Sequence, residues 1–531
     1  MAKLIFFVGL LLLFVTAFGQ RDIDVLHYKY EIELSDLSDS IKAKASIQVK
    51  FNQQSDKFWL DLASPNKAGK GMLAYKFLEE DNKSLTGKQT GNKLELILST
   101  PAEKDETRSF TIEYKGIPAD GLIISKTKYG HRSFFADNWP NRGHNWLPCV
   151  DDPADKATVE FIVNAPQHYQ VVSNGVQIEE SDLAHGYKRT HWKEDTPIAT
   201  KVMVIGVARF SVNLAGMIDQ CIPVYSWVYP EDRDKGFYDY AQANEILPFF
   251  IQHVGPYGYK KLANVQSKTT FGGLENANTI FYHENSINGQ RKSEALMAHE
   301  IAHQWFGNMA TEKSFAHLWL SEGFATYMTI LYMESKYGKD SARAMLAEDR
   351  REVIEYAKTG DRPVVDETKD YMQLLNPNSY QKGGWVLHML RSQLGDSIFW
   401  KSIRSYYATY AGKNADTKDV QDIFEKTSGK DLSQFFRQWL YTPGVPRLEI
   451  GWKYTAAEKK ITLTLKQNQE TPFSFPLDIA IRSSEGKTET KQIRISRAEQ
   501  TFSIPVKAAV KSIEPDPDIT FLGEMRVKEL K

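Results

Sequence analysis

The chain has 531 residues, of which 42% are hydrophobic and 25% charged, so it can bury large cores and is not a disordered polypeptide. Its 66 basic residues balance 67 acidic ones and form no long basic run, which argues against nucleic acid as a partner. The length predicts two to four domains.

The first predicted element is an export signal at residues 1–19. One lysine precedes an apolar run over residues 4–15, and the small-x-small triplet AFG follows at 17–19. This pattern is typical of a cleaved secretory signal peptide. The alternative is a membrane anchor, but the run is short for a spanning helix. We therefore expect an exported protein, periplasmic or secreted, with no stable membrane anchor after cleavage.

Strands are predicted over most of residues 20–210. In residues 28–34 and 41–51, hydrophobic residues alternate with polar ones, and turn residues separate the runs. A period of two indicates antiparallel sheet with one buried face. We therefore predict an N-terminal antiparallel β-domain over residues 20–210.

Two cysteines, Cys149 and Cys221, are too few for a disulfide framework. The sequence leaves open whether they pair in an exported chain or remain free thiols. Neither is assigned a catalytic role.

The middle of the chain changes to helical periodicity. Residues 232–255 and 341–360 have helical spacing, and a glycine closes each of them. Further helices are predicted as far as residues 432–440. Together these segments predict a mixed domain over residues 211–442.

The end of the chain returns to strands. The segment TPGVP at residues 442–446 breaks the last helix and is interpreted as a linker. Beyond it, residues 461–465 and 477–481 alternate hydrophobic and polar side chains. We therefore predict a small β-sandwich over residues 443–531.

The most informative motif is HEIAH in the middle domain. Ser293 is predicted to cap a helix that runs to Gly307. In such a helix, His299 and His303 lie one turn apart on the same face and can share one zinc ion. Glu300 lies about 100° around the helix, where it can reach a metal-bound water without being a ligand. The alternative interpretation is an ordinary polar helix face.

A catalytic zinc site needs a third protein ligand and one open position. After eighteen intervening residues, Ser321 is predicted to cap a second helix, with Glu322 in its first turn. An isolated glutamate there would be interpreted as a carboxylate that stabilises the helix N-terminus. Its separation from HEIAH instead predicts Glu322 as the third ligand.

A second motif, GGLEN, precedes HEIAH. Gly272 and Gly273 leave backbone accessible beside an extended stretch, which suits pairing with a peptide. Glu275 offers a carboxylate near the predicted zinc helix, and Asn276 is assigned to the same substrate site. Taken alone, the glycines would only indicate a turn and Glu275 an exposed side chain.

A third motif, YQKGG, follows the helices. Tyr380 precedes a Lys-Gly-Gly turn that is predicted to open another amphipathic helix. A phenol aimed at the metal could donate a hydrogen bond to a tetrahedral oxyanion. In isolation, a tyrosine at a helix start is more often a packing residue.

HEIAH with Glu322, GGLEN and YQKGG, in this combination, resemble the motifs of the M1 family of zinc aminopeptidases. Members are gluzincins with a thermolysin-like mixed α/β catalytic domain. Four more segments resemble family landmarks, so the resemblance extends over nearly all of the chain after the signal: residues 24–34, 147–158, 254–262 and 438–450.

The resemblance implies a role for each motif residue. It implies one zinc ion per chain, bound by His299, His303 and Glu322. It implies Glu300 as the general base and Tyr380 as the residue that stabilises the transition state. It also implies that Glu275 binds the free α-amine of the substrate, beside Gly272, Gly273 and Asn276.

This sequence departs from the family pattern at two places. Leu274 replaces a methionine with a side chain of similar volume. Where many relatives carry glutamine or glutamate as a second substrate contact, this chain has Asp137, Asn138 and Trp139. Which of these three faces the substrate stays open, and with it the preferred N-terminal side chain.

Together these features predict a multidomain α+β protein that acts as an exported zinc-dependent aminopeptidase on peptides with a free N-terminus. The alternatives are a zinc endopeptidase or epoxide hydrolase on the same scaffold, and a non-catalytic peptide-binding relative. The GGLEN carboxylate argues against an endopeptidase, and the intact ligands and base argue against a non-catalytic protein. The sequence indicates no oligomeric state.

Overall fold

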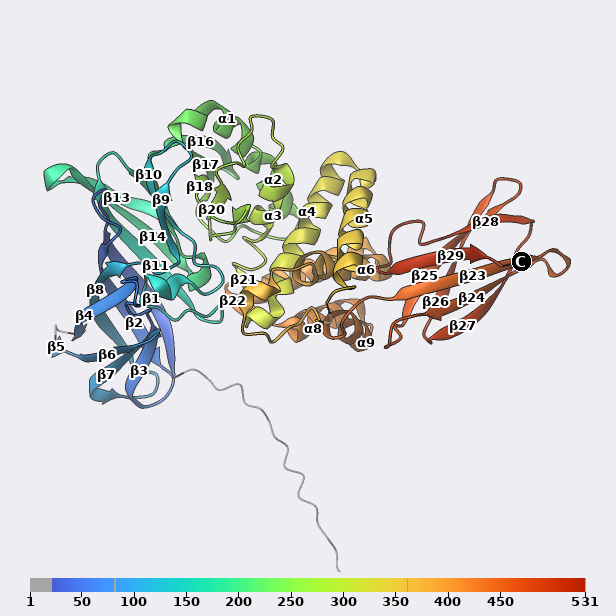
Figure 1. Cartoon of the computed structure of the whole chain (residues 1–531), viewed down its shortest axis with the longest axis horizontal. Coiled ribbons are helices and arrows are strands. Elements are labelled where there is room, and N and C mark those ends of the chain that lie inside the picture. Colours follow the sequence, from blue (N-terminus) through green and yellow to red (C-terminus); the bar gives the residue numbers. More distant parts are fainter. Residues whose placement is uncertain (1–21, 81–82, 361, 531) are drawn as a thin grey trace, which may run out of the picture.

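Figure 1 shows a computed structural model of the chain, which describes residues 22–80, 83–360 and 362–530. A strand-rich N-terminal part, a mixed central part and a strand-rich C-terminal part lie in a row (Figure 1). The predicted multidomain organisation, with a β-rich N-terminal part and a mixed middle, is confirmed. The expected signal peptide at residues 1–19 lies outside the described residues.

An eight-stranded sheet dominates the N-terminal part, in the order β13-β14-β11-β1-β2-β8-β4-β5. Its pairs are antiparallel except for β1 and β11, which run parallel. The predicted alternation is confirmed in β2, where every second side chain is buried. The strands are β1 (Ile23–Glu33), β2 (Ile41–Phe51), β4 (Gly71–Glu79), β5 (Lys83–Ser84), β8 (Thr107–Ile117), β11 (Lys156–Pro166), β13 (Val176–Leu183) and β14 (Tyr187–Ala199).

Two smaller sheets complete the N-terminal part, in the orders β3-β7-β6 and β12-β15-β10-β9. Both are antiparallel. Their strands are β3 (Ser55–Asp61), β6 (Thr86–Thr90), β7 (Lys93–Ala102), β9 (Leu122–Lys126), β10 (Arg132–Ala136), β12 (Gln170–Ser173) and β15 (Ile205–Ala208).

The central part begins with a five-stranded mixed sheet in the order β16-β17-β18-β20-β19. Strands β17, β18 and β20 run parallel, whereas β16 and β19 pair antiparallel with their neighbours. Gly273 and Leu274 of the GGLEN motif form β19, so Gly273 lies on an edge strand of this sheet. The strands are β16 (Ser211–Ile218), β17 (Ile222–Val228), β18 (Leu262–Ser267), β19 (Gly273–Leu274) and β20 (Thr279–His283).

Helices make up most of the rest of the central part. The helix predicted over residues 341–360 is confirmed as α5, but the one predicted over residues 232–255 is divided into α1 and α2. At the division, the side-chain amide of Gln242 donates to the carbonyl of Asp239, which competes with continued helix hydrogen bonding. The helices are α1 (Arg233–Tyr240), α2 (Ala243–His253), α3 (Glu294–Ala302), α4 (Glu322–Tyr337), α5 (Lys339–Tyr356), α6 (Gly383–Leu394), α7 (Asp396–Tyr410), α8 (Thr417–Ser428) and α9 (Ser433–Phe436).

Short elements connect these helices. The π-helical turn η8 (Asn378–Lys382) carries Tyr380, and a second such turn, η9 (Arg437–Tyr441), follows α9. Strand β21 (Ala310–Glu312) pairs with β22 (Lys413–Ala415).

Residues 442–446 have no helix or strand, as the linker prediction expected. After them, two sheets form the C-terminal part, in the orders β27-β24-β23-β29 and β26-β25-β28. The strands are β23 (Arg447–Thr455), β24 (Lys460–Gln467), β25 (Phe475–Ser483), β26 (Thr488–Ile495), β27 (Glu499–Pro505), β28 (Val510–Pro515) and β29 (Glu524–Glu529).

Buried polar contacts tie the three parts together. The ammonium of Lys201 in the N-terminal part lies 2.5 Å from the carboxylate of Glu312 in the central part, and both side chains are almost fully buried. Lys382 of η8 donates to the carbonyl of Gly444 in the linker at 2.8 Å. Arg350 of α5 pairs with the carboxylate of Asp516 in the C-terminal part at 2.6 Å.

The two cysteines are free thiols, with Cys149 buried and Cys221 exposed, which resolves the question that the sequence left open. In the part of the chain that the structure describes, no helix combines the length and the hydropathy needed to cross a membrane.

Candidate functional site

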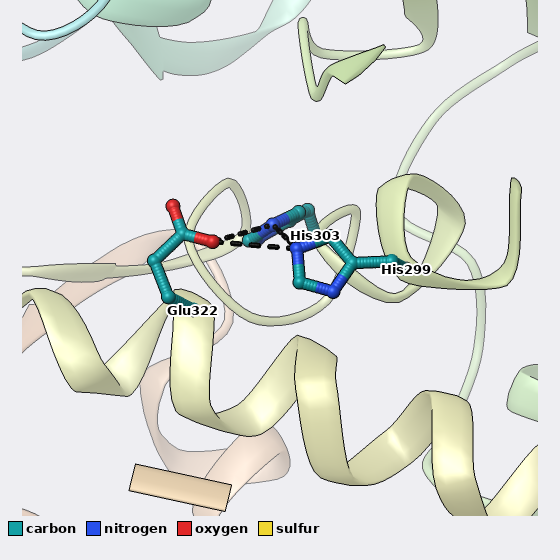
Figure 2. Close-up of side chains that lie close together, drawn as sticks. All are labelled: His299, His303 and Glu322. Atoms are coloured by element: carbon teal, nitrogen blue, oxygen red, sulfur yellow. Dashed lines mark hydrogen bonds and ion pairs between the residues drawn. The ribbon is translucent and has the colours of Figure 1, made fainter. Parts of the chain in front are cut away.

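Three side chains converge on one point: those of His299 in α3, His303 directly after α3 and Glu322 in α4 (Figure 2). Nε2 of His299 lies 3.1 Å from Nε2 of His303, and Oε2 of Glu322 lies 3.3 Å and 3.2 Å from these two atoms. Ligand atoms of a tetrahedral zinc site are about 3.3 Å apart, so the donor set fits this ion. Within the described ranges, it is the one group of three or more metal-ligating side chains gathered in this way.

Helix α3 is shorter than predicted, since it ends at Ala302 rather than at Gly307. The amide of His303 still donates to the carbonyl of His299 at 3.2 Å, which keeps the two imidazoles one turn apart. The next amide, that of Gln304, bonds only three residues back, and Gly307 then adopts a φ of +109°. The chain therefore leaves the helix immediately after the second histidine.

The two predicted serine caps are wrong as side-chain caps. The hydroxyl of Ser293 donates to the carbonyl of Ser286 at 2.6 Å instead of to the first turn of α3. The hydroxyl of Ser321 lies 3.0 Å from Nδ1 of His303 instead of capping α4. Tertiary contacts thus outcompete local capping at both helix starts.

The tautomer of His303 is set on the side of the ring away from the cluster. Nδ1 lies 3.1 Å from the carbonyl oxygen of Phe306, which can only accept a hydrogen bond. Nδ1 therefore carries a hydrogen, which leaves Nε2 as the ring nitrogen that can bind a metal ion. The hydroxyl of Ser321 contacts the same Nδ1 and helps to fix the orientation of the imidazole ring.

Glu300 is buried directly against β19. A Cβ atom at Gly273 would collide with its carboxylate, whereas at Gly272 the nearest obstacle, a methyl of Leu296, is 3.8 Å away. From the sequence, the two glycines were interpreted as leaving backbone accessible. The structure adds a steric reason for glycine at position 273, because a side chain there would displace Glu300. Burial raises the pKa of Glu300 well above its usual value, and His303 offsets this shift only in part.

Glu275 follows β19 and is buried in the same region. Its main-chain carbonyl accepts hydrogen bonds from the side chains of Asn308, at 2.6 Å, and Gln304, at 3.1 Å. Its carboxylate oxygen Oε1 has no partner among the described residues. Burial raises the pKa of this carboxyl, while His303 lowers it. A buried carboxylate with a free acceptor is therefore available to a cation.

The loop after Glu275 is fixed by Asn278, a residue that sequence reasoning missed. Asn278 adopts a φ of +51°, a conformation that asparagine tolerates better than most residues. Its side-chain oxygen accepts from the ammonium of Lys261 at 2.6 Å and from the amide of Gly175 at 2.8 Å. The neighbouring Asn276 is buried, and its side-chain amide has no partner within the described ranges.

Tyr380 stacks over the cluster from η8, with its ring 6.1 Å from that of His299 and nearly parallel to it. The predicted Lys-Gly-Gly turn is wrong, because η8 continues directly into α6. A Cβ atom at Gly323 of α4 would lie 2.8 Å from Cα of Gly383, so these glycines permit a close helix contact. Burial raises the pKa of Tyr380 well above its usual value, which keeps the phenol protonated.

One cavity of about 250 Å³ brings the predicted site residues together, apart from Asn276. Of the three residues whose orientation the sequence left open, Trp139 lines it. The other lining residues are Phe271, Gly272, Gly273, Leu274, Glu275, Leu296, His299, Glu300, His303, Glu322, Leu375 and Tyr380.

Comparisons with known proteins match most of the chain to two family models. Residues 25–202 match the peptidase M1 N-terminal domain, and residues 238–439 match the peptidase family M1 domain.

Individual relatives are similar at lower identity. A probable aminopeptidase 2 of Sulfurisphaera tokodaii is 25% identical over 77% of this chain and 54% of its own length. Glutamyl aminopeptidase of Homo sapiens is 25% identical over 78% of this chain and 46% of its own length. Aminopeptidase M1-A of Oryza sativa is 27% identical over 62% of this chain and 39% of its own length. The chain thus spans about half the length of the curated relatives it matches.

Proposed function

Because the chain belongs to peptidase family M1, we propose that it is a zinc-dependent aminopeptidase that removes the N-terminal residue of peptides. The observation that carries this proposal is the buried carboxylate of Glu275, whose Oε1 lacks a partner among the described residues and whose side chain lines the same cavity as the metal-ligating cluster. In the same proposal, residues 211–442 form a thermolysin-like catalytic domain and residues 443–531 a β-sandwich.

His299, His303 and Glu322 would hold one zinc ion per chain. Two imidazoles and one carboxylate are a common donor set of catalytic zinc, and three protein ligands leave a position open for water or substrate. Zinc supplies Lewis acidity, which makes water nucleophilic near neutral pH. The contact between His303 and Phe306 supports this role, because it holds Nδ1 on the far side of the ring and leaves Nε2 for the metal ion.

Glu300 is the proposed general base, and Tyr380 the proposed oxyanion donor. The carboxylate of Glu300 takes a proton from the attacking water and passes it to the leaving amine. Its carboxylate lines the same cavity as the metal-ligating cluster, where the attacking water would lie. The phenol of Tyr380, which burial keeps protonated, donates a hydrogen bond to the oxyanion.

Glu275 sets which bond is cut in this proposal. A free α-ammonium group pairs with its carboxylate, in a charge-assisted contact that is stronger than a neutral one. The peptide main chain lies along Gly272 and Gly273, whose strand β19 is at an edge of its sheet and can accept a further strand. The scissile bond then follows the first residue, and Asn276 supports the same substrate site.

The competing functions are less well supported. An endopeptidase has no use for a buried carboxylate that stops the peptide after one residue. An epoxide hydrolase is not favoured by any observed contact. A non-catalytic peptide-binding protein does not require a base and a phenol beside the metal ligands.

Export is the proposed localisation, with cleavage of the signal peptide at residues 1–19. The pattern of a lysine, an apolar run and a small-x-small triplet supports it. N-terminal sequencing of protein from the exported fraction tests this proposal. A mature chain that begins near Gln20 is the expected result, and a chain that still begins at Met1 contradicts it.

The metal dependence of hydrolysis tests the proposed function. We expect about one zinc ion per chain in the purified protein, and release of the first residue from unblocked aminoacyl amides. A chelator should abolish this release and added zinc should restore it. Full activity in metal-stripped protein, or no hydrolysis of any aminoacyl amide by zinc-loaded protein, contradicts the proposal.

A further inference from the structure

Two of the three residues left open by the sequence are committed to structural contacts. Asp137 is fully buried, and its carboxylate pairs with the guanidinium of Arg142. Asn138 donates to the carbonyl of Met203 at 2.6 Å and accepts from the indole N–H of Trp146 at 2.8 Å. Neither side chain lines the cavity beside the metal-ligating cluster. Trp139 is therefore the residue of this segment that can meet a substrate.

Trp139 forms a rigid wall of that cavity. It is 3% exposed, and its ring packs edge-on against Phe271 and Phe315, at centroid distances of 5.9 Å and 6.3 Å. Its indole N–H has no acceptor in the part of the chain that the structure describes. Two aromatic side chains thus hold the indole in place, and its buried N–H group has no partner among the described residues.

The remaining walls of the cavity are mainly apolar. Phe271, Leu274, Leu296 and Leu375 line it together with Trp139. Its charged lining residues are three glutamates and two histidines, and no lysine or arginine is among them. The guanidinium of Arg142 lies 5.9 Å from the Phe271 ring, but it is paired with Asp137 and Asp120.

These walls discriminate between side chains by charge. An acidic side chain would lose its hydration near Glu275, Glu300 and Glu322, and no lysine or arginine lines the cavity to pair with it. A basic side chain would also lose hydration. It would gain no ion pair in return, because the three carboxylates already have other tasks at the site. An apolar side chain instead gains from leaving water and from contact with the indole and leucine walls.

We propose that Trp139 is the specificity-determining residue of this site, and that the cavity takes an uncharged apolar side chain of the N-terminal residue. The inference rests on the proposed aminopeptidase function and names its substrate class. The volume of about 250 Å³ agrees with it, because it falls below the roughly 300–1,000 Å³ of sites for larger ligands and suits a single residue.

A panel of aminoacyl amides tests the preference in zinc-loaded protein. The amides of Leu, Met, Phe, Ala, Glu, Asp and Lys differ only in the side chain that enters the cavity. We expect kcat/KM for Leu, Met or Phe to exceed that for Glu and Asp by about 10²-fold, the ratio expected from burying one apolar side chain. Equal or faster cleavage of the Glu or Asp amide overturns the inference.

Variants of Trp139 test the residue itself. In Trp139→Ala the apolar wall is lost, so the ratio of kcat/KM for Leu amide over Ala amide should fall about 10-fold. Trp139→Phe keeps an aromatic wall and should retain most of the ratio. This variant keeps the test decisive even if Trp139→Ala does not fold. Trp59→Ala removes an indole that is 41% exposed on the N-terminal part, and should leave the ratio unchanged. An unchanged ratio in folded Trp139→Ala overturns the assignment.

Binding provides a readout that does not depend on turnover. In zinc-loaded Glu300→Gln, calorimetry should give a Kd for leucine amide about 10-fold or more below that for glutamate α-amide. Adding Trp139→Ala should narrow this difference. If no unblocked amide is bound or cleaved, the proposed function itself fails. If amides are cleaved but the acidic ones bind as tightly, only the specificity inference fails.

Discussion

At the scale of single residues, three carboxylates share one cavity but have different surroundings. Burial acts to raise the pKa of Glu322, but His303 and His299 hold it well below its usual value. Burial raises the pKa values of Glu300 and Glu275, which lack such close cationic partners. The three carboxyl groups therefore have different environments, which agrees with the different roles proposed for them.

Glu300→Gln should separate the base from the ligands. The amide keeps the shape of the side chain but cannot take the proton of water, so turnover should fall roughly 10²-fold or more while zinc stays bound. Glu322→Gln should instead weaken zinc binding. Elemental analysis with kinetics on leucine amide measures both effects. Near wild-type turnover in Glu300→Gln would remove this residue from the mechanism.

Ser321→Ala should weaken zinc binding without removing a ligand. The variant loses the hydroxyl that lies 3.0 Å from Nδ1 of His303, and loss of such support typically costs about 10-fold or more in metal affinity. Ser293→Ala is the matched control, because its hydroxyl bonds to Ser286 outside the cluster. Competition with a chelator measures the affinity. Equal affinity in the two variants would contradict a supporting role for Ser321.

The cluster of metal-ligating side chains was predictable, whereas the contacts that support it were not. His299, His303 and Glu322 meet because helix spacing and the position of a helix start follow directly from the sequence. The contact of Ser321 with His303 and the role of Asn278 were missed because their partners are distant in sequence or belong to another element. A serine directly before a candidate ligand, and an asparagine at a tight bend, are the signals that could have indicated them.

At the scale of elements, the site depends on close contact between an edge strand and a helix. Strand β19 lies against the carboxylate of Glu300 on α3, and Gly273 leaves the room for it. On the other side, α4 approaches η8 and α6 through Gly323 and Gly383. Glycine thus sets two distances at the site, that from the strand to Glu300 and that from α4 to the turn of Tyr380.

Gly273→Ala should lower activity sharply while the protein remains folded. A Cβ atom there would collide with the Glu300 carboxylate and displace it, and a base that is misplaced by about 1 Å can cost roughly 10²-fold in rate. Gly272→Ala is the control, because its Cβ would meet only Leu296 at 3.8 Å. Kinetics and thermal denaturation of both variants measure the effect. Similar rates in the two variants would show that the contact at residue 273 has no catalytic importance.

Strands were easier to predict than helix ends. The alternation in residues 41–51 predicts β2 because one face of the sheet is buried along its whole length. Helix ends depend on which side chain takes the last carbonyl or first amide, and Gln242 and Ser293 take partners that no local pattern indicates. The Lys-Gly-Gly segment was predicted as a turn because glycine favours turns, whereas Gly383 instead permits a close contact with α4.

At the scale of the whole molecule, the candidate site lies in the central part and is supported by both neighbours. Asn174 of the N-terminal part donates to the carbonyl of Ala277, directly after the GGLEN motif, at 2.7 Å. Lys382, two residues after Tyr380, donates to Gly444 of the linker. Composition and periodicity predicted the succession of the three parts, but such pairs between distant segments leave no pattern in the sequence.

The contact between the central and C-terminal parts should weaken in acid. His388 of α6 donates to the carbonyl of Ile519 at 2.8 Å and lies 2.9 Å from the hydroxyl of Tyr327. Burial lowers the pKa of His388 from 6.5 to about 4. Between these values the unfolded chain binds the extra proton and the folded chain does not. The free energy of unfolding is therefore highest above pH 6.5 and falls by roughly 3 kcal/mol as the pH is lowered to about 4.

His388→Gln tests this prediction, because glutamine does not titrate. The denaturation midpoint of the wild-type protein should fall more between pH 7 and pH 5 than that of the variant. Equal shifts in the two proteins would show that His388 does not contribute to the acid sensitivity.

The most direct test of the account compares one peptide with its N-acetylated twin. Acetylation removes the positive charge that Glu275 is proposed to bind and leaves its buried carboxylate unpaired. Zinc-loaded protein should therefore trim the unblocked peptide about 10–10²-fold faster than it cuts the acetylated one, the range of one charge-assisted hydrogen bond. Glu275→Ala should lower the rate on the unblocked peptide and narrow this ratio. Internal cleavage of the acetylated peptide as fast as trimming of its unblocked twin would contradict the aminopeptidase proposal and favour an endopeptidase.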